Sequence, residues 1–177
     1  MKRGINEMYL LGYEESMQAH ERFMRLLEHD ERLMNIIEKN NVNIDDILYL
    51  PIDDESTYKV IAITKSLAKY LFNNGHYELF DIQFDVMKHT VRDEYNRISG
   101  FNLHVDCYMH YDVNVVNPPL IHVDDKVKFE YGFGFENTDI KMYHRVSTHS
   151  EFTVGSLSEL VSCMFAIMHK LLDENEQ

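Results

Sequence analysis

Histidine and aspartate recur two residues apart in the second half of the chain. The pattern His-x-Asp occurs at His104/Asp106, His110/Asp112 and His122/Asp124. On a β-strand, residues i and i+2 lie on one face, so both side chains of such a pair can reach a single ion. Imidazole nitrogens and carboxylate oxygens are common ligands of divalent transition metals. The strand that begins at Phe101 is therefore the predicted place of any metal site, with the ligands His104, Asp106, His110 and Asp112.

This metal hypothesis implies a particular chemistry. Two histidines and one carboxylate with open coordination positions form the facial triad of non-haem iron enzymes. His144 or His149 could supply a missing histidine, and Arg145 could bind a substrate carboxylate. The similarity to such oxygenases is limited to this spacing, because their fold needs about eight strands and this sequence predicts three or four. The alternative is an ordinary solvated strand face that carries no cofactor.

Other catalytic motifs are missing from the sequence. It contains neither a G-x-S-x-G nucleophile motif nor the glycine-rich loops that bind nucleotide phosphates. The two cysteines, Cys107 and Cys163, lie at apolar positions of the pattern. Packed thiols at such positions are usually unreactive. A non-catalytic role is therefore favoured over an enzymatic one.

A strict period of two predicts a β-strand over residues 101–116. Every odd-numbered residue from Phe101 to Val115 is apolar, and the residues between them are polar. Such a strand has one buried face and one solvated face. The solvated face carries the His-x-Asp pairs.

Apolar residues at three- and four-residue spacing predict helices over 6–28, 31–40, 55–73 and 77–98. Asp30 is the expected N-cap of the second helix. The first helix is expected to bury the stripe formed by Leu10, Tyr13, Met17, His20, Met24 and Leu27. The segment 77–98 is ambiguous, because its residues 80–86 alternate as in a strand. We choose the helix there because its pattern extends further.

The last third of the chain predicts more strands and one helix. We expect an extended piece at 120–123 and strands at 127–135 and 140–146. Ser156 and Glu159 form a capping-box pattern that opens a well-buried helix over 157–172. The predicted fold is therefore α+β, with N-terminal helices, a three- to four-stranded antiparallel sheet and a C-terminal buried helix. The 177 residues are expected to form one domain.

The solvated sheet face is also a candidate partner-binding surface. Gly132 and Gly134 lack side chains there, which would let another backbone approach closely. Tyrosine is a frequent anchor of interfaces. The candidate partner-binding residues are Tyr108, Lys128, Glu130, Tyr143 and Arg145. The alternative is that the N-terminal helices of the chain itself cover this patch.

The formal net charge is −13 and is spread over both halves of the chain. Direct binding to nucleic acid is not expected, because contacts to phosphates need a basic surface. Anionic membranes would repel the chain as well. No stretch approaches the ~18 apolar residues that span a bilayer, and we expect a soluble, cytoplasmic protein.

Together these features predict an acidic, non-catalytic protein-binding module. Acidic surfaces attract basic partners, so the expected partner is a basic protein, such as one that handles nucleic acid. The chain would inhibit or regulate it, as phage and mobile-element accessory proteins do. The first alternative is a metal-dependent enzyme that uses the His-x-Asp ligands. The second is a homo-oligomer joined through a sheet edge or through helices.

Overall fold

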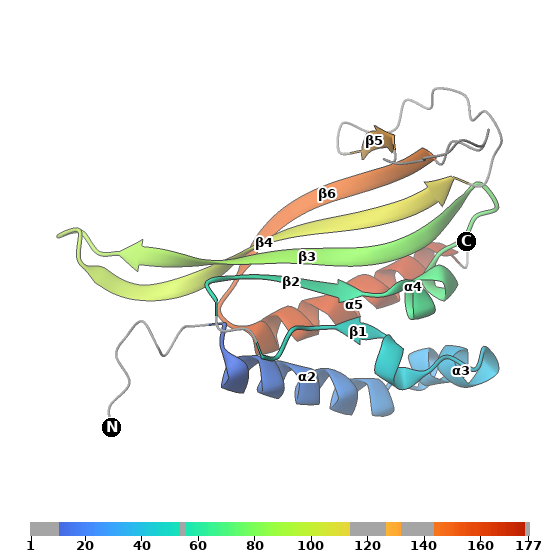
Figure 1. Cartoon of the computed structure of the whole chain (residues 1–177), viewed down its shortest axis with the longest axis horizontal. Coiled ribbons are helices and arrows are strands. Elements are labelled where there is room, and N and C mark those ends of the chain that lie inside the picture. Colours follow the sequence, from blue (N-terminus) through green and yellow to red (C-terminus); the bar gives the residue numbers. More distant parts are fainter. Residues whose placement is uncertain (1–10, 54–55, 114–126, 132–143, 176–177) are drawn as a thin grey trace.

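The computed structural model describes residues 11–53, 56–113, 127–131 and 144–175. In this part of the chain, six strands form one antiparallel sheet in the order β1-β2-β3-β4-β6-β5 (Figure 1). The strands are β1 (Leu48–Tyr49), β2 (Tyr58–Ile63), β3 (Tyr77–Arg92), β4 (Ile98–Val113), β5 (Val127–Tyr131) and β6 (His144–Val154). The helices are α2 (Tyr13–Glu28), α3 (Glu31–Lys39), the 3-10 helix η1 (Ile44–Asp46), α4 (Lys65–Leu71) and α5 (Leu157–Asn175). The predicted α+β class is confirmed, although the sheet has more strands than expected.

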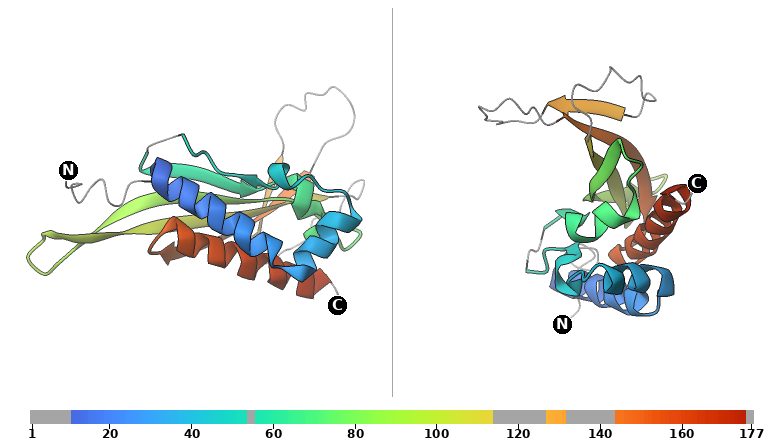
Figure 2. Two further views of the ribbon diagram at one scale, coloured as in Figure 1. Left: turned by 90° about the horizontal axis from the view of Figure 1, so that it is seen from below. Right: turned by 90° about the vertical axis from the view of Figure 1, so that its right-hand side faces the viewer.

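The helices pack against one face of the sheet and leave the other face without helices (Figures 1 and 2). The long helix α5 packs beside α2, and the rings of Phe23 and Phe165 join the two helices with centroids 5.1 Å apart. Arg32 of α3 forms an ion pair with Asp173 of α5 at 2.7 Å. Two elements distant in sequence thus form one helical layer.

The buried stripe of α2 differs from the predicted stripe. Its buried residues are Ser16, Ala19, Phe23 and Leu27. Tyr13 is 49% exposed, and His20 is half-buried rather than part of the core. Ser16 of the stripe accepts a hydrogen bond from Lys59 of β2, and Phe23 packs on Phe165 of α5. Since both faces of this helix carry methionine or aromatic residues, the apolar pattern alone did not distinguish them.

The predicted helix caps are confirmed. The Asp30 carboxylate accepts a hydrogen bond from the backbone N–H of Leu33 at 3.0 Å. Ser156 Oγ accepts one from Glu159 N at 3.1 Å, and the Glu159 carboxylate accepts one from Gly155 N at 2.6 Å. This capping box opens α5, which continues to Asn175, three residues beyond the expected end.

The helix predicted over 55–73 is wrong. Residues 58–63 are strand β2, and only α4 is helical. Alternation along β2 places Lys59, Ile61 and Ile63 on the inner side. Lys59 is 1% exposed, and its ammonium donates to Ser16 Oγ at 2.6 Å and to the Pro51 carbonyl at 2.5 Å. Because the inner position 59 holds a lysine, the apolar residues of this segment do not show the period of two that predicts a strand.

The helix predicted over 77–98 is also wrong, because residues 77–92 are the long strand β3. Leu79, Ile82, Phe84 and Val86 are buried. An irregularity between Leu79 and Asp81 shifts the register by one residue, so the inner positions do not follow a single period of two. Hydrogen bonds to β2 and β4 on both sides outweigh the local helical pattern.

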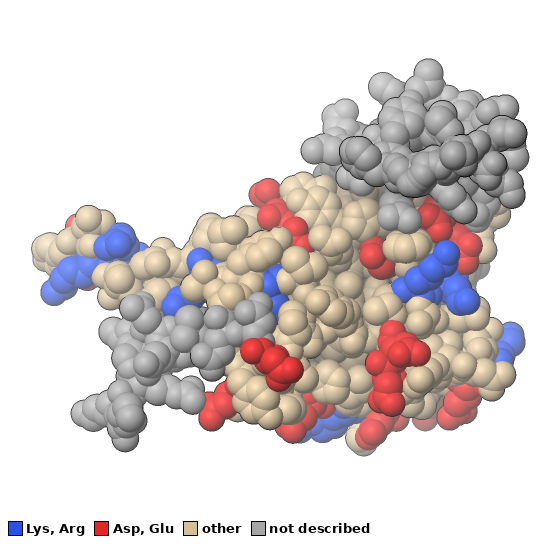
Figure 3. Space-filling model, viewed as in Figure 1, with Lys and Arg blue, Asp and Glu red and all other residues tan. Residues whose placement is uncertain are grey.

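The β3–β4 hairpin extends well past the helices (Figure 1). Tyr95 in its turn is 70% exposed, and Ile98 at the start of β4 is 43% exposed. Arg97 pairs with Asp93 across the turn at 3.0 Å. In Figure 3, Lys and Arg side chains gather at this free end, whereas Asp and Glu side chains follow the body of the protein.

The strand predicted at 101–116 is confirmed as β4, which spans Ile98–Val113. Leu103, Val105 and Cys107 are buried on its inner side. β5 confirms the start of the second predicted strand, and β6 begins within the third and extends it to Val154. The expected elements at 120–123 and 132–143 lie outside the described residues. None of the helices in the described ranges is long and apolar enough to cross a membrane.

Candidate functional site

The face of the sheet opposite the helices, here called the outer face, combines polar side chains from four adjacent strands. Antiparallel register fixes which residues share it, because side chains alternate between the two faces. The outer-face residues are Tyr58, Val60 and Ala62 of β2; Glu78, Asp81, Gln83, Asp85, Met87 and His89 of β3; Asn102, His104, Asp106, Tyr108, His110 and Asp112 of β4; and Ser147, His149, Glu151 and Thr153 of β6. Six are acidic, namely Glu78, Asp81, Asp85, Asp106, Asp112 and Glu151, and the register adds Arg145 of β6, opposite Asp112, and Lys128 of β5, opposite Ser147, to the same face.

Three carboxylates form a row across the middle of the outer face. Asp85 of β3 lies opposite Asp106 of β4, and Asp106 lies opposite Glu151 of β6. Directly opposed residues have Cβ atoms only about 5 Å apart, and like charges in such positions are destabilising. The row therefore lowers the free energy of unfolding, and nearby positive charge would offset this loss. We call these three residues the carboxylate row.

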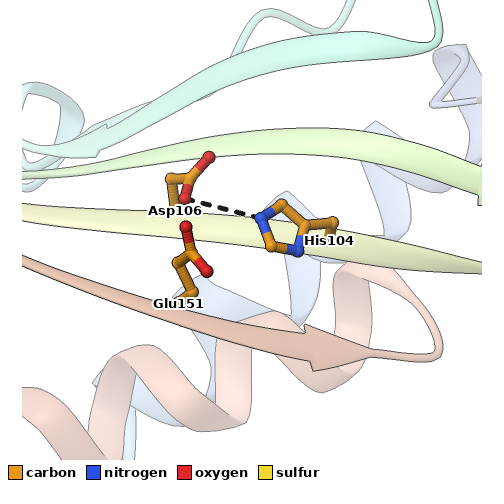
Figure 4. Close-up of side chains that lie close together, drawn as sticks. All are labelled: His104, Asp106 and Glu151. Atoms are coloured by element: carbon orange, nitrogen blue, oxygen red, sulfur yellow. Dashed lines mark ion pairs between the residues drawn. The ribbon is translucent and has the colours of Figure 1, made fainter.

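Two histidines contact the centre of the carboxylate row. His149 Nε2 lies 2.9 Å from Asp106 Oδ1, and His104 Nε2 lies 3.5 Å from the same oxygen. Ligand atoms of His104, Asp106 and Glu151 all lie within 4.8 Å of one another (Figure 4). The hydrogen bond from His149 is the main cause that holds the pKa of Asp106 below its ordinary value. The charge of His104 acts in the same direction, and partial burial opposes both.

The four predicted metal ligands fall into two separate places. His104 and Asp106 lie together at the carboxylate row. His110 is instead paired with Asp81 of β3, with Nδ1 and Oδ1 2.6 Å apart. Asp112 lies 3.4 Å from the ammonium of Lys65, at the start of α4. The second His-x-Asp pair therefore takes part in a hydrogen bond with Asp81 and an ion pair with Lys65, and does not extend the first.

Aromatic rings cover part of the outer face. Tyr108 stacks on His149 with centroids 4.7 Å apart and on His110 at 6.2 Å. His104 stacks on His89 at 5.3 Å. Burial raises the pKa of the Tyr108 hydroxyl, and the nearby charges of Asp106, Asp85 and Glu151 raise it further. The smaller part of this pKa shift, which comes from the three carboxylates, reflects the negative charge of this face.

Of the predicted partner-binding residues, Tyr108 lies on the outer face among these rings. The register pairs Lys128 of β5 with Ser147, and Glu130 with Arg145. These two pairs continue the outer face toward the sheet edge, but their Lys, Glu and Arg side chains are not among those described. Tyr143, with the glycines at 132 and 134, lies outside the described residues.

Four residues of the outer face were not predicted as site residues from the sequence. His149 was considered only as a spare histidine, and Glu151 was not considered because the third strand was expected to end at 146. Asp81 and Asp85 were assigned to a helix. The signal that could have found His149 and Glu151 is a second short pattern, His-x-Glu, within a segment whose even-numbered residues 146, 152 and 154 are apolar.

Neither cysteine is positioned as a nucleophile. Burial raises the pKa of Cys107 to about 12, and burial also raises the pKa of Cys163. At pH 8 the Cys107 thiol therefore stays protonated, whereas the thiolate is the reactive form. This agrees with the prediction of packed, unreactive thiols.

We expect Cys107 to resist alkylation in the folded protein. Incubation with iodoacetamide at pH 8, followed by peptide mass spectrometry, should leave Cys107 unmodified for hours in buffer. In urea the same residue should react within minutes, because unfolding restores an ordinary thiol pKa near 8.5. Rapid labelling of Cys107 in the native state would contradict the burial described here.

Comparison with protein-family models, with curated proteins and with solved structures gives no match to this chain. The function must therefore be argued from the outer face itself.

Proposed function

We propose that the protein is a non-catalytic binding module whose outer face recognises a basic segment of another protein and thereby inhibits or regulates that protein. The observation that carries this proposal is the carboxylate row, in which three acids on adjacent strands lie directly opposite one another. Directly opposed like charges weaken a sheet. Positive charge from a bound partner would relieve that repulsion.

The chemistry around the row fits lysine and arginine side chains. Tyr58, Met87 and Glu151 are 45%, 45% and 59% exposed, so a partner can reach this surface. The flat rings of Tyr108 and His149 offer stacking surfaces beside the carboxylates, and guanidinium groups combine stacking with bidentate contacts to carboxylates. An arginine of a basic peptide segment could therefore stack on these rings and bind the carboxylates at the same time.

The overall charge supports a protein partner rather than a nucleic acid. A net charge of −13 would repel phosphate backbones. The same charge raises the rate at which a basic protein associates, and this effect weakens as salt screens it. A basic protein that itself binds nucleic acid is the partner class that this surface would block best.

Neutralising two outer-face acids should weaken the complex. The test variant is Asp81→Asn with Asp85→Asn, which removes two negative charges and keeps side-chain size. If each charge contributes about 0.7 kcal/mol, the dissociation constant should rise about tenfold. The matched control is Glu28→Gln with Glu38→Gln, which removes the same charge from exposed positions on the helical side.

Wild type and both variants should be used as baits in lysate of the source cells, with a chelator present, at about 50 and about 300 mM salt. Quantitative mass spectrometry should show basic proteins retained by wild type and by the control at low salt. They should be depleted on the outer-face variant and lost from all baits at high salt. Equal retention on all three baits, or no specific protein on wild type at low salt, would reject the proposal.

A further inference from the structure

We infer that His104, Asp106, His149 and Glu151 form a binding site for one divalent transition-metal ion, with Zn²⁺ as the representative ion. This inference does not depend on the proposed partner binding. It departs from the ligand set that the sequence predicted, because His149 and Glu151 of β6 take the places of His110 and Asp112.

The site consists of two similar pairs on neighbouring antiparallel strands. β4 contributes His104-x-Asp106 and β6 contributes His149-x-Glu151, each with both side chains on the outer face. The register places the two acids directly opposite one another. The two histidines consequently lie on opposite sides of the acid pair, and both approach Asp106 with their Nε2 atoms.

Ligand atoms of His104, Asp106 and Glu151 all lie within 4.8 Å of one another, and His149, which contacts Asp106 but lies outside that group, would join them by a side-chain movement. Metal–ligand bonds to imidazole and carboxylate are about 2.0–2.2 Å long, so ligand atoms lie about 3.3–3.5 Å apart in a tetrahedral site and about 2.9–3.0 Å apart as neighbours in an octahedral site. The separations here are 2.9 Å for His149 Nε2 to Asp106 Oδ1 and 3.5 Å for His104 Nε2 to that oxygen. His149 Nε2 lies 3.9 Å from Glu151 Oε1.

The ligand types select the class of ion. Two imidazole nitrogens favour zinc and other late first-row metals, whereas Mg²⁺ and Ca²⁺ prefer sites made entirely of oxygen ligands. A dication between Asp106 and Glu151 would also cancel the cross-strand repulsion of the carboxylate row. The side chains are 28–32% exposed except Glu151 at 59%, so an ion can enter from solvent.

The experiment is calorimetric titration of the untagged, chelator-treated protein with Zn²⁺ at pH 7.5, without any partner. We expect one saturating equivalent with a dissociation constant in the micromolar range or lower. His104→Ala and His149→Ala should each weaken binding at least tenfold, and Glu151→Gln, which changes an exposed side chain, should weaken it severalfold. Mg²⁺ and Ca²⁺ at millimolar concentration should not compete.

His110→Ala is the matched control, because His110 lies on the same strand face and pairs with Asp81 rather than with the proposed ligands. It should bind Zn²⁺ as tightly as wild type. The inference fails if wild type shows no saturable binding, or if the His104 and His149 variants keep full affinity. It also fails if loss of His110 weakens binding as much as loss of His104. Partner binding is measured with chelator present and with other residues changed, so either proposal can fail without the other.

Discussion

Replacing Val86 with aspartate is expected to lower the free energy of unfolding by about 4 kcal/mol or more. Val86 is 0% exposed on the inner face of β3, opposite Val105 of β4. The substitution loses about 2 kcal/mol of apolar burial and places a carboxyl group in the core without a partner, which costs a few kcal/mol more. Since a domain of this size is stabilised by only about 5–15 kcal/mol, the variant should be partly or wholly unfolded. Urea unfolding followed by circular dichroism measures the change.

The control is the same substitution one residue later. Met87 is 45% exposed on the outer face, so Met87→Asp should change the free energy of unfolding by less than about 1 kcal/mol. A helix over 77–98 would reverse this order, because it buries Met87 with Phe84 and turns Val86 outward. A well-folded Val86→Asp beside an unfolded Met87→Asp would therefore overturn the assignment of β3.

Phe23→Ala is expected to cost about 3–5 kcal/mol, which is the usual range for a fully buried aromatic residue. Phe23 is 0% exposed and packs on Phe165, so its removal leaves a cavity between α2 and α5. Chemical denaturation gives the difference from wild type, and the slope of the transition should stay unchanged if unfolding remains two-state.

Tyr13→Ala on the same helix is the companion variant. Tyr13 belongs to the stripe that the sequence predicted as buried, yet it is 49% exposed. Its replacement should cost less than about 1 kcal/mol. If Tyr13→Ala were the more destabilising of the two, the helix would be rotated about its axis and the predicted stripe would be the buried one.

The sequence predicted well those elements whose signals are local. β4 follows from strict alternation over residues 101–113, and the start of α5 follows from the Ser156/Glu159 box. β2 and β3 were missed because the apolar alternation of each strand is interrupted. Lys59 interrupts the apolar alternation of β2, and the irregularity after Leu79 shifts that of β3. A one-residue shift exchanges the two faces of a strand. The alternation of apolar residues in 77–92 is therefore broken, and the three- and four-residue spacing of a helix fits the segment over a longer range.

The candidate site was also predicted only where the signal is local to one strand. The placement of His104 and Asp106 on one solvated face was predictable, because both lie on β4 at i and i+2. The neighbours that complete the carboxylate row come from β3 and β6, and only the sheet order brings them next to β4. His110 and Asp112 satisfy the same local pattern but pair with Asp81 and Lys65. Spacing along one strand thus identified the face and not the set of residues that act together on it.

The central claim is that the outer face is the binding surface of this protein, and backbone NMR with a lysine-rich peptide tests it most directly. Titration of ¹⁵N-labelled protein in low salt, with chelator present, should perturb amide signals in residues 81–89, 102–112 and 147–153. Signals from α2 and α3, whose exposed faces also carry acids, should stay in place. Perturbations confined to those helices, or none in the outer-face strands at saturating peptide, would contradict the claim.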